Sequence, residues 1–559
     1  MEKIFRIFGK EYFNVNHAAL LLGFFALLSQ ILGLFRDRAI AHVIGPSPLL
    51  DAYYAAFRIP DLIFISIASL ASVTVLVPFI VSRMKGEQLG EEAHKFLNNI
   101  FTVFIILLVI VSIIAFILLP YIVHFIAPGF DTLLQGKVVE LSRIMLLSPI
   151  LLGLSNLFGT ITQLFRKFFL YALSPLFYNF GIIIGIFFLY PNFGIIGLAF
   201  GVVLGALLHF IIQMFSSASC GLYPSFTWPI NFKEIKQVVM ISLPRTIGLS
   251  LNNIALICIV SFASFLHAGS ISIFNLSLNL QTVPLGIIGL SYAVAAFPTL
   301  TKSFSKEDKS EFIDHLRGAS RAIIFWSLPI TFLFIVLRAQ IVRTILGSGS
   351  FSWENTRLVA ASLALFSLSI VAQGLIALFA RAYYAGGNTK RPLYINLISS
   401  ICIIIFAYLL LNIFKSSNQF QYFIESVLKV QGINGTEVLM LPLAYSIGTI
   451  INFSLLWFFI KKDFIHAQAF ILKTFLQSLF ASLVIGIVSY FFLNIFSPIF
   501  GTVTFWGIFL QGFFSGGLGI IAGVIILYLL GNQELKDLSK TLKSKFWRTK
   551  VVAPSQEGI

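Results

Sequence analysis

The sequence predicts an all-α polytopic membrane protein with fourteen transmembrane helices, built as two six-helix pseudo-symmetric lobes and two C-terminal helices. Composition is the first observation behind this prediction: 58% of the 559 residues are hydrophobic, 11% are charged, and the mean hydropathy is +0.95. A soluble fold of this length cannot bury so large an apolar share. The other two observations are the ordered run of apolar stretches and an internal repeat.

The apolar stretches give the helix count, because a helix needs about 20 mostly apolar residues to cross the hydrocarbon. We place spans at 18–45, 52–82, 97–119, 139–164, 170–190, 194–216, 236–262, 271–300, 319–337, 356–383, 392–413, 437–460, 470–494 and 503–530. Several exceed the minimum length, so tilted helices or helices that extend beyond the membrane are expected.

The distribution of basic residues tests that count. With the N-terminus inside, 27 of the 38 Lys and Arg residues fall in inside segments, 6 in outside segments and 5 within spans. Cytoplasmic segments of membrane proteins carry such an excess of Lys and Arg. The alternation therefore supports fourteen spans with both termini cytoplasmic.

An internal repeat divides the chain. Residues 164–179 (LFRKFFLYALSPLFYN) and 378–396 (LFARAYYAGGNTKRPLYIN) share an Arg, an aromatic pair, a turn, Pro-Leu and a later Asn: Arg166, Pro175 and Asn179 against Arg381, Pro392 and Asn396. Chance similarity between apolar helices is the alternative. A true repeat predicts an N-lobe at 18–216, a linker at 217–235 and a C-lobe at 236–460, after a cytoplasmic segment at 1–17. Six helices per copy give both lobes one orientation, with a binding site between them.

The first span contains the charged triplet Arg36-Asp37-Arg38. A membrane-embedded cation normally faces a protein-lined, water-filled cavity, which indicates a carrier for something negatively charged. Arg36 is the first candidate for anion binding, because a guanidinium matches phosphate oxygens with forked donors. Asp37 would hold the geometry of Arg36. The alternative is that the span ends at Leu34 and leaves the triplet in an outside loop.

Three further charges are candidates. Arg58 and Asp61 are spaced i, i+3 and could pair on one helix face, either in the site or only to orient the helix. Arg245 follows Pro244 at the start of the seventh span. It would face the cavity from the second lobe or reach the headgroup region as a snorkelling side chain.

Other functional classes lack their motifs. Cys220, Cys258 and Cys402 are far apart, and neither HExxH, GxGxxG nor P-loop spacing occurs. We therefore expect no enzyme activity, metal, cofactor or nucleotide-driven pumping by this chain. The net charge of +16 mostly reflects the inside bias and does not indicate nucleic acid. The basic tail at 532–559 either sets topology or binds anionic lipid or a partner.

Several segments carry a family resemblance: 29–62 (SQILGLFRDRAIAHVIGPSPLLDAYYAAFRIPDL), 264–272 (SFLHAGSIS), 283–300 (VPLGIIGLSYAVAAFPTL), 345–351 (ILGSGSF) and 380–392 (ARAYYAGGNTKRP). In this order they resemble the MurJ (MviN) proteins, the lipid II flippases of the multidrug/oligosaccharidyl-lipid/polysaccharide exporter superfamily. The similarity covers almost the whole chain.

The resemblance implies a multi-pass protein of the bacterial cytoplasmic (inner) membrane that serves peptidoglycan synthesis. Its partners would be an undecaprenyl-diphosphate-linked muropeptide and membrane lipids, with cell-wall synthesis proteins as a further class. It also implies alternating access of the two lobes and a groove for the lipid tail in the final pair, 461–531. Without an ATP motif, an electrical or ion gradient would drive transport.

The chain departs from the family at several cationic positions. Gln30 stands where the family has Arg, Phe64-Ile65 where it has Arg-Arg, Ser69-Leu70 where it has Glu-Gly, and Leu278-Asn279 where it has Asp-Arg. In the family these arginines are thought to hold the diphosphate. Asn279 stays a candidate substrate contact, with Arg36, Asp37, Arg38, Arg58, Asp61 and Arg245. The family's span-seven sodium carboxylate is also missing from LNNIALICIVSFAS (251–264), so we predict no sodium site.

These departures leave three functions open. The first is a lipid II flippase. The second is an exporter of another polyprenyl-linked saccharide or amphiphile, and the third is a non-transporting scaffold for wall synthesis. Retention of Arg36 and Asp37 argues against the scaffold, because a membrane-buried charge without a use is costly.

Overall fold

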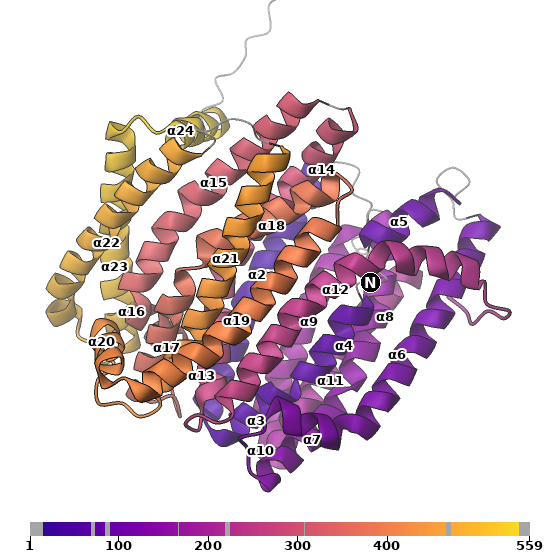
Figure 1. The fold of residues 1–559 in the computed structure, drawn as a ribbon, viewed down its shortest axis with the longest axis horizontal. Helices are drawn as coiled ribbons and strands as arrows, with labels where there is room; N and C mark the ends of the chain where they lie inside the picture. Colours follow the sequence, from indigo (N-terminus) through magenta and orange to yellow (C-terminus); the bar gives the residue numbers. More distant parts are fainter. Residues whose placement is uncertain are drawn as a thin grey trace, which may run out of the picture.

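The computed structural model describes residues 15–68, 73–83, 90–165, 167–218, 224–306, 308–464 and 471–546, and this part of the chain is helical throughout its regular structure. Side chains at 15–20, 68, 73–75, 78, 241, 244–245 and 541–546 are outside the description. Figure 1 shows long, roughly parallel helices, as expected for a chain whose backbone must satisfy its own hydrogen bonds in lipid.

The first helix group contains the helices from α2 to α11, which pack mainly against one another. Its elements are α2 (Val15–Val43), α3 (Pro48–Ala56), α4 (Arg58–Ala68), α5 (Val73–Val81), α6 (Glu91–Ile126), α7 (Thr132–Met145), α8 (Leu147–Leu164), α9 (Phe168–Ile184), η1 (Gly185–Leu189), α10 (Tyr190–Phe193) and α11 (Ile195–Ala218).

The second helix group contains the helices from α12 to α21. Its elements are α12 (Phe232–Ala263), α13 (Ser270–Pro284), η2 (Leu285–Leu290), α14 (Ser291–Ser305), α15 (Lys309–Val336), α16 (Arg338–Leu346), α17 (Trp353–Ser367), α18 (Ile370–Ala385), α19 (Lys390–Ser416), α20 (Asn418–Leu428), η3 (Thr436–Leu439) and α21 (Met440–Asp463).

The last three helices lie beside the second group. The long pair α22 (Leu472–Phe500) and α23 (Phe505–Leu529) packs together and against α15 and α16. The short helix α24 (Gln533–Phe546) follows, and it lies across the end of this pair at the top of Figure 1.

The helices that are long and apolar enough to cross a membrane coincide with most of the predicted spans. Within the described residues, eleven stretches are long and apolar enough to cross a membrane, and α17 with α18, bent by 44°, makes a twelfth. These twelve coincide with the third to fourteenth predicted spans. The first two predicted spans contain α2, with its three charges, and the broken run α3 to α5. The number fourteen therefore stays a prediction.

Apolar side chains cover the outside of the helices as well as the inside. On α6, Ile110, Ile113, Ile114 and Ile117 are each about half exposed or more, at 49%, 54%, 50% and 61%. A soluble protein rarely exposes so continuous an apolar surface. This surface is the one that the bilayer would cover.

In two of the early spans a helix break lies three residues before a proline. Pro60 lies in the first turn of α4, just after the break at Phe57, and Pro149 lies in the first turn of α8, after the break at Leu146. Proline is tolerated in a first turn, where its missing N–H has no partner to lose. The break at Phe57 separates α3 and α4, which both line the site described next.

Candidate substrate-binding site

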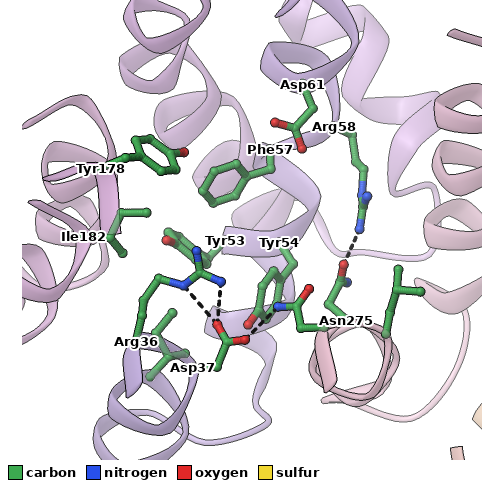
Figure 2. A pocket seen from close by; sticks show the side chains of 13 residues that line it. Arg36, Asp37, Tyr53, Tyr54, Phe57, Arg58, Asp61, Tyr178, Ile182 and Asn275 are labelled. Carbon is green, nitrogen blue, oxygen red and sulfur yellow. Dashed lines mark hydrogen bonds and ion pairs between the residues drawn. The ribbon is translucent and has the colours of Figure 1, made fainter. Parts of the chain in front are cut away.

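A cavity of about 270 Å³ lies where α2, α3, α4 and α9 of the first group meet α13 of the second. Figure 2 shows charged and aromatic side chains converging on it. Its lining contains Arg36, Asp37, Ile40, Tyr53, Tyr54, Phe57, Arg58, Asp61, Tyr178, Ile182, Asn275, Leu278 and Asn279.

Arg36 lies within α2, and each of its three guanidinium nitrogens donates one hydrogen bond. Its Nε and Nη2 donate to Oδ1 of Asp37 at 3.0 and 2.8 Å, and its Nη1 donates to Oδ1 of Asn179 on α9 at 3.0 Å. Nδ2 of Asn279 on α13 donates to the second oxygen of Asp37 at 3.1 Å. A hydrogen-bonded chain therefore runs from α9 through α2 to the second group. The alternative of an outside loop is wrong, because α2 continues to Val43.

Arg58 makes a different contact from the predicted one. Its Nη2 donates to Oδ1 of Asn275 on α13 at 2.5 Å, and its Nε is buried without a hydrogen-bond partner. The expected ion pair with Asp61 is wrong: no atoms of these two side chains lie within ion-pairing distance in the described structure. Figure 2 shows why, since Arg58 points away from Asp61 toward Asn275. Asp61 lines the cavity without a hydrogen bond from its carboxylate to any described residue.

Arg38 does not line this cavity. Its Nη1 donates to the carbonyl oxygens of Thr344 and Ile345 at 2.6 and 3.1 Å, and its guanidinium lies 5.6 Å from the ring centroid of Phe505. Residues two apart on a helix point about 200° away from each other. Arg36 and Arg38 therefore face opposite sides of α2.

The other two candidates have different outcomes. Asn279 lines the cavity and contacts Asp37. Arg245 belongs to α12, but its side chain lies outside the described residues. Its place in the site therefore stays a prediction.

The residues predicted from the sequence did not include Tyr53, Tyr54, Tyr178 or Asn275, and Asn179 entered only as part of the repeat. Helical spacing carried a signal for some of them. Tyr54, Arg58 and Asp61 are spaced i, i+4, i+7, and Asn275 and Asn279 are spaced i, i+4, so each set shares one face. Nothing in the sequence indicated that these faces meet.

The site is close to electrically balanced. It holds two arginines, Arg36 and Arg58, and two aspartates, Asp37 and Asp61. No cluster of three or more His, Cys, Asp or Glu residues suited to a metal ion occurs in the part of the chain that the structure describes. The side chains of the site can form hydrogen bonds to a polar group and recognise its charge inside a membrane protein.

A membrane-spanning helical fold with a polar cavity between two helix groups defines a transport protein. Solved structures share this fold: a lipid II flippase MurJ in an inward closed conformation matches with a TM-score of 0.72 and 24% identity, over 93% of this chain and all of that one. An inward-facing multidrug resistance transporter of the MATE family, in the MOP superfamily, matches with a TM-score of 0.62 and 15% identity, over 78% of this chain and 95% of that one.

The chain belongs to the lipid II flippase MurJ family, whose family model matches residues 40–418. A probable lipid II flippase MurJ of Buchnera aphidicola subsp. Schizaphis graminum is 28% identical over 396 residues, which cover 69% of this chain and 76% of that protein. The lipid II flippase MurJ of Burkholderia cenocepacia is 27% identical over 396 residues, with coverages of 68% and 75%.

Proposed function

We propose that this protein flips lipid II, the lipid-linked peptidoglycan precursor, from the inner to the outer leaflet of the bacterial cytoplasmic membrane. Membership in the MurJ family supports the substrate class. The observation that carries the proposal is Arg36, a charged side chain that lines a cavity between the two helix groups of a membrane protein. Such a charge is costly in lipid and is retained where it serves a polar substrate.

The proposed topology has fourteen spans and both termini in the cytoplasm. Here α2 and the broken run α3–α5 are the first two spans, the N-lobe is 18–216 and the C-lobe is 236–460. The Lys and Arg distribution supports the orientation. The preference of each helix group for its own members supports two lobes. The basic segment 532–559 would then face the cytoplasm.

Arg36 is the proposed anchor for the diphosphate. Each guanidinium nitrogen already donates to one protein acceptor, and Asp37 supplies the anionic acceptor. A carboxylate in that place holds the guanidinium in position and partly neutralises it while the cavity is empty. A phosphate oxygen would replace a carboxylate oxygen of Asp37, because both accept forked donors. Asp37 would then remain bonded to Asn279.

Alternating access would be the mechanism, because the two helix groups touch at both ends of the molecule. At the end that carries α3, Asp51 contacts the start of α13. At the end that carries α5, Arg83 pairs with Glu234 at 3.2 Å, and Ser66 bonds Ser250 at 2.9 Å. Opening toward either leaflet requires one set of contacts to break while the other holds. A membrane potential would contribute about 2.3 kcal/mol per charge per 100 mV to moving an anion outward.

The lipid tail would lie in an apolar groove of about 420 Å³ beside α23. Residues from α13, η2, α15, α16 and α23 line it, including Pro284, Leu333, Phe513 and Ile520. It is almost wholly apolar, which suits an isoprenoid chain. This placement supports the assignment of 461–531 to tail binding.

A related export function is the second candidate, and one observation favours it. Leu278 and Asn279 line the cavity at positions where the family has Asp-Arg, so the cavity holds Arg36 and Arg58 as its described cationic side chains. Fewer cations weaken attraction for a diphosphate. Another polyprenyl-linked saccharide or an amphiphile would then be the cargo.

Rescue of a bacterium depleted of its own lipid II flippase tests the proposal. We expect the intact chain to restore growth and Arg36→Ala to fail, because alanine removes the anion anchor and leaves Oδ1 of Asp37 and Oδ1 of Asn179 without their donor. Arg317→Ala is the matched control, since Arg317 lies away from the cavity and bonds Asp314 at 3.1 Å. It should rescue like the intact chain.

Expression must be compared in the same cells by membrane immunoblot. Rescue by Arg36→Ala would remove Arg36 from the mechanism. Failure of the intact chain despite normal membrane levels would favour the related exporter or a non-transporting scaffold for cell-wall synthesis proteins. In vesicles, movement of a different lipid-linked saccharide would separate those two.

A further inference from the structure

Three tyrosine hydroxyls border the cavity without a described partner. The side chains are those of Tyr53 and Tyr54 on α3 and Tyr178 on α9. Tyr53 is 2% exposed and Tyr54 8%, and the hydroxyl of Tyr54 is fully buried with no hydrogen bond. A buried hydroxyl without a partner costs about 1–3 kcal/mol. Such a cost is tolerable where a ligand completes the bond during the transport cycle.

The aromatic faces form a wall beside those hydroxyls. The rings of Tyr53 and Tyr54 meet edge-on at 5.6 Å, and Phe57 meets Tyr53 at 5.0 Å. Figure 2 places Tyr178 on the opposite side of Phe57 from Tyr54, so aromatic groups enter the cavity from two helices. A ring with a polar tip offers an apolar face and a hydrogen-bonding group together.

The available polar groups suit an uncharged, hydroxyl-rich ligand. A tyrosine hydroxyl both donates and accepts, and an ionised carboxylate accepts. Asp61 adds such a carboxylate to the same cavity with its oxygens free of hydrogen bonds in the described structure. Two arginines and two aspartates balance each other in charge, so this part of the cavity gives no net attraction to a second anion. A sugar needs both donors and acceptors, whereas a phosphate needs donors alone.

We propose that Tyr53, Tyr54, Tyr178 and Asp61 form a saccharide subsite, which holds the first sugar of the substrate beside the diphosphate at Arg36. The inference rests on the proposed function and names the groups that would make this chain selective for a glycosylated lipid. The sugar hydroxyls bond the tyrosine hydroxyls and the Asp61 carboxylate, and the aromatic wall packs on the sugar ring.

Binding to the purified full chain in nanodiscs tests this subsite with two probes. One is undecaprenyl diphosphate, and the other is the same lipid carrying one N-acetylmuramyl residue. The intact chain should bind the sugar-bearing lipid more tightly. In Tyr54→Phe/Tyr178→Phe we expect its affinity to fall about tenfold while that of the sugar-free lipid changes less than about twofold, since two hydrogen bonds are lost from the sugar alone.

The control is Tyr445→Phe, because Tyr445 is also buried but lies on α21 outside the cavity. It should leave both affinities unchanged. The variant Asp61→Asn shows whether a sugar or a phosphate lies beside Asp61. If a sugar lies beside Asp61, the sugar-bearing lipid binds more weakly. If a phosphate lies there, removal of a like charge tightens binding of both lipids.

Several results would overturn the subsite. The subsite is contradicted if the intact chain binds the two lipids with equal affinity. It is also contradicted if the double variant loses affinity for both lipids equally or for neither. Tighter binding of both lipids by Asp61→Asn would contradict it as well. Binding of neither lipid by the intact chain would instead contradict the proposed function itself. Melting temperatures of the variants in nanodiscs establish that a loss of affinity does not come from unfolding.

Discussion

At the scale of single residues, the neighbouring cations Arg36 and Arg38 have different roles. Both lie in α2, and both are bonded, but Arg36 faces the cavity while Arg38 holds carbonyl oxygens in the last turn of α16. A cation at a helix C-terminus is favourable because the last carbonyls lack partners and carry partial negative charge. Arg38 is therefore a contact between the helix groups.

The variant Arg38→Ala tests whether Arg38 stabilises the contact between the helix groups and does not bind substrate. We expect the variant to lose about 2 kcal/mol of stability, since charged hydrogen bonds to two carbonyls disappear. Its affinity for the lipid-linked substrate should stay close to that of the intact chain, whereas Arg36→Ala should lose that affinity. Thermal unfolding in detergent and binding in nanodiscs measure the two effects. Equal loss of substrate affinity in both variants would return Arg38 to the site.

At the scale of helices, glycine determines how closely α9 and α11 approach. Residues 194–208 (GIIGLAFGVVLGALL) place Gly197, Gly201 and Gly205 four residues apart, a spacing typical of close helix packing. The structure confirms it: a Cβ added at Gly205 would collide with the backbone of Tyr178, and one added at Gly201 would meet Gly185. Because α9 carries both Tyr178 and Asn179, this packing sets the position of a cavity residue and of the amide that accepts from Arg36.

Gly205→Leu should therefore damage the site through the helix. We expect the free energy of unfolding to fall by about 1–3 kcal/mol, because the added side chain overpacks the helix contact. Substrate binding should also weaken, because Tyr178 and Asn179 shift. The matched control is Gly23→Leu on α2, where an added Cβ meets nothing within 4 Å. Size-exclusion profiles and melting curves in detergent compare the two. A normal melting temperature for Gly205→Leu would contradict the close packing.

At the scale of the whole molecule, the helix groups are joined by a helix cap that crosses between them. Asp51 of α3 is 3% exposed and accepts hydrogen bonds from the backbone N–H of Gly269 and Ser272 and from the Ser272 hydroxyl, at 2.7, 2.7 and 2.6 Å. An anion at a helix N-terminus satisfies donors that the helix cannot. Outward opening would have to break this cap.

Asp51→Ala should loosen the α3 end of the molecule. Hydrogen exchange at Gly269 and Ser272 should become faster, because their N–H groups lose a buried acceptor worth about 1–3 kcal/mol. Asp131→Ala is the control, since Asp131 caps α7 within its own group at 2.8 Å. It should change exchange only in the first turn of α7. Unchanged exchange at the start of α13 in Asp51→Ala would contradict the role of Asp51 in closure.

The sequence by itself determined the class of protein and twelve of its spans. Apolar runs, the Lys and Arg distribution and the motifs around Arg36 are local properties, so they could be interpreted without knowing which helices touch. Twelve of the predicted spans coincide with helices able to cross a membrane, and family membership followed from the motifs. Arg36, Asp37, Arg58, Asp61 and Asn279 were all placed in the site from sequence and all line one cavity.

Only the tertiary structure decided which faces meet. Arg38 left the site because the carbonyls of α16 lie on its side of α2, and Arg58 turned to Asn275, which is 217 residues away in the chain. Tyr178 entered the site because glycines bring α9 against α11. Helix periodicity gives the direction of a side chain relative to its own axis. The partner in that direction depends on packing between distant segments, which no local pattern specifies.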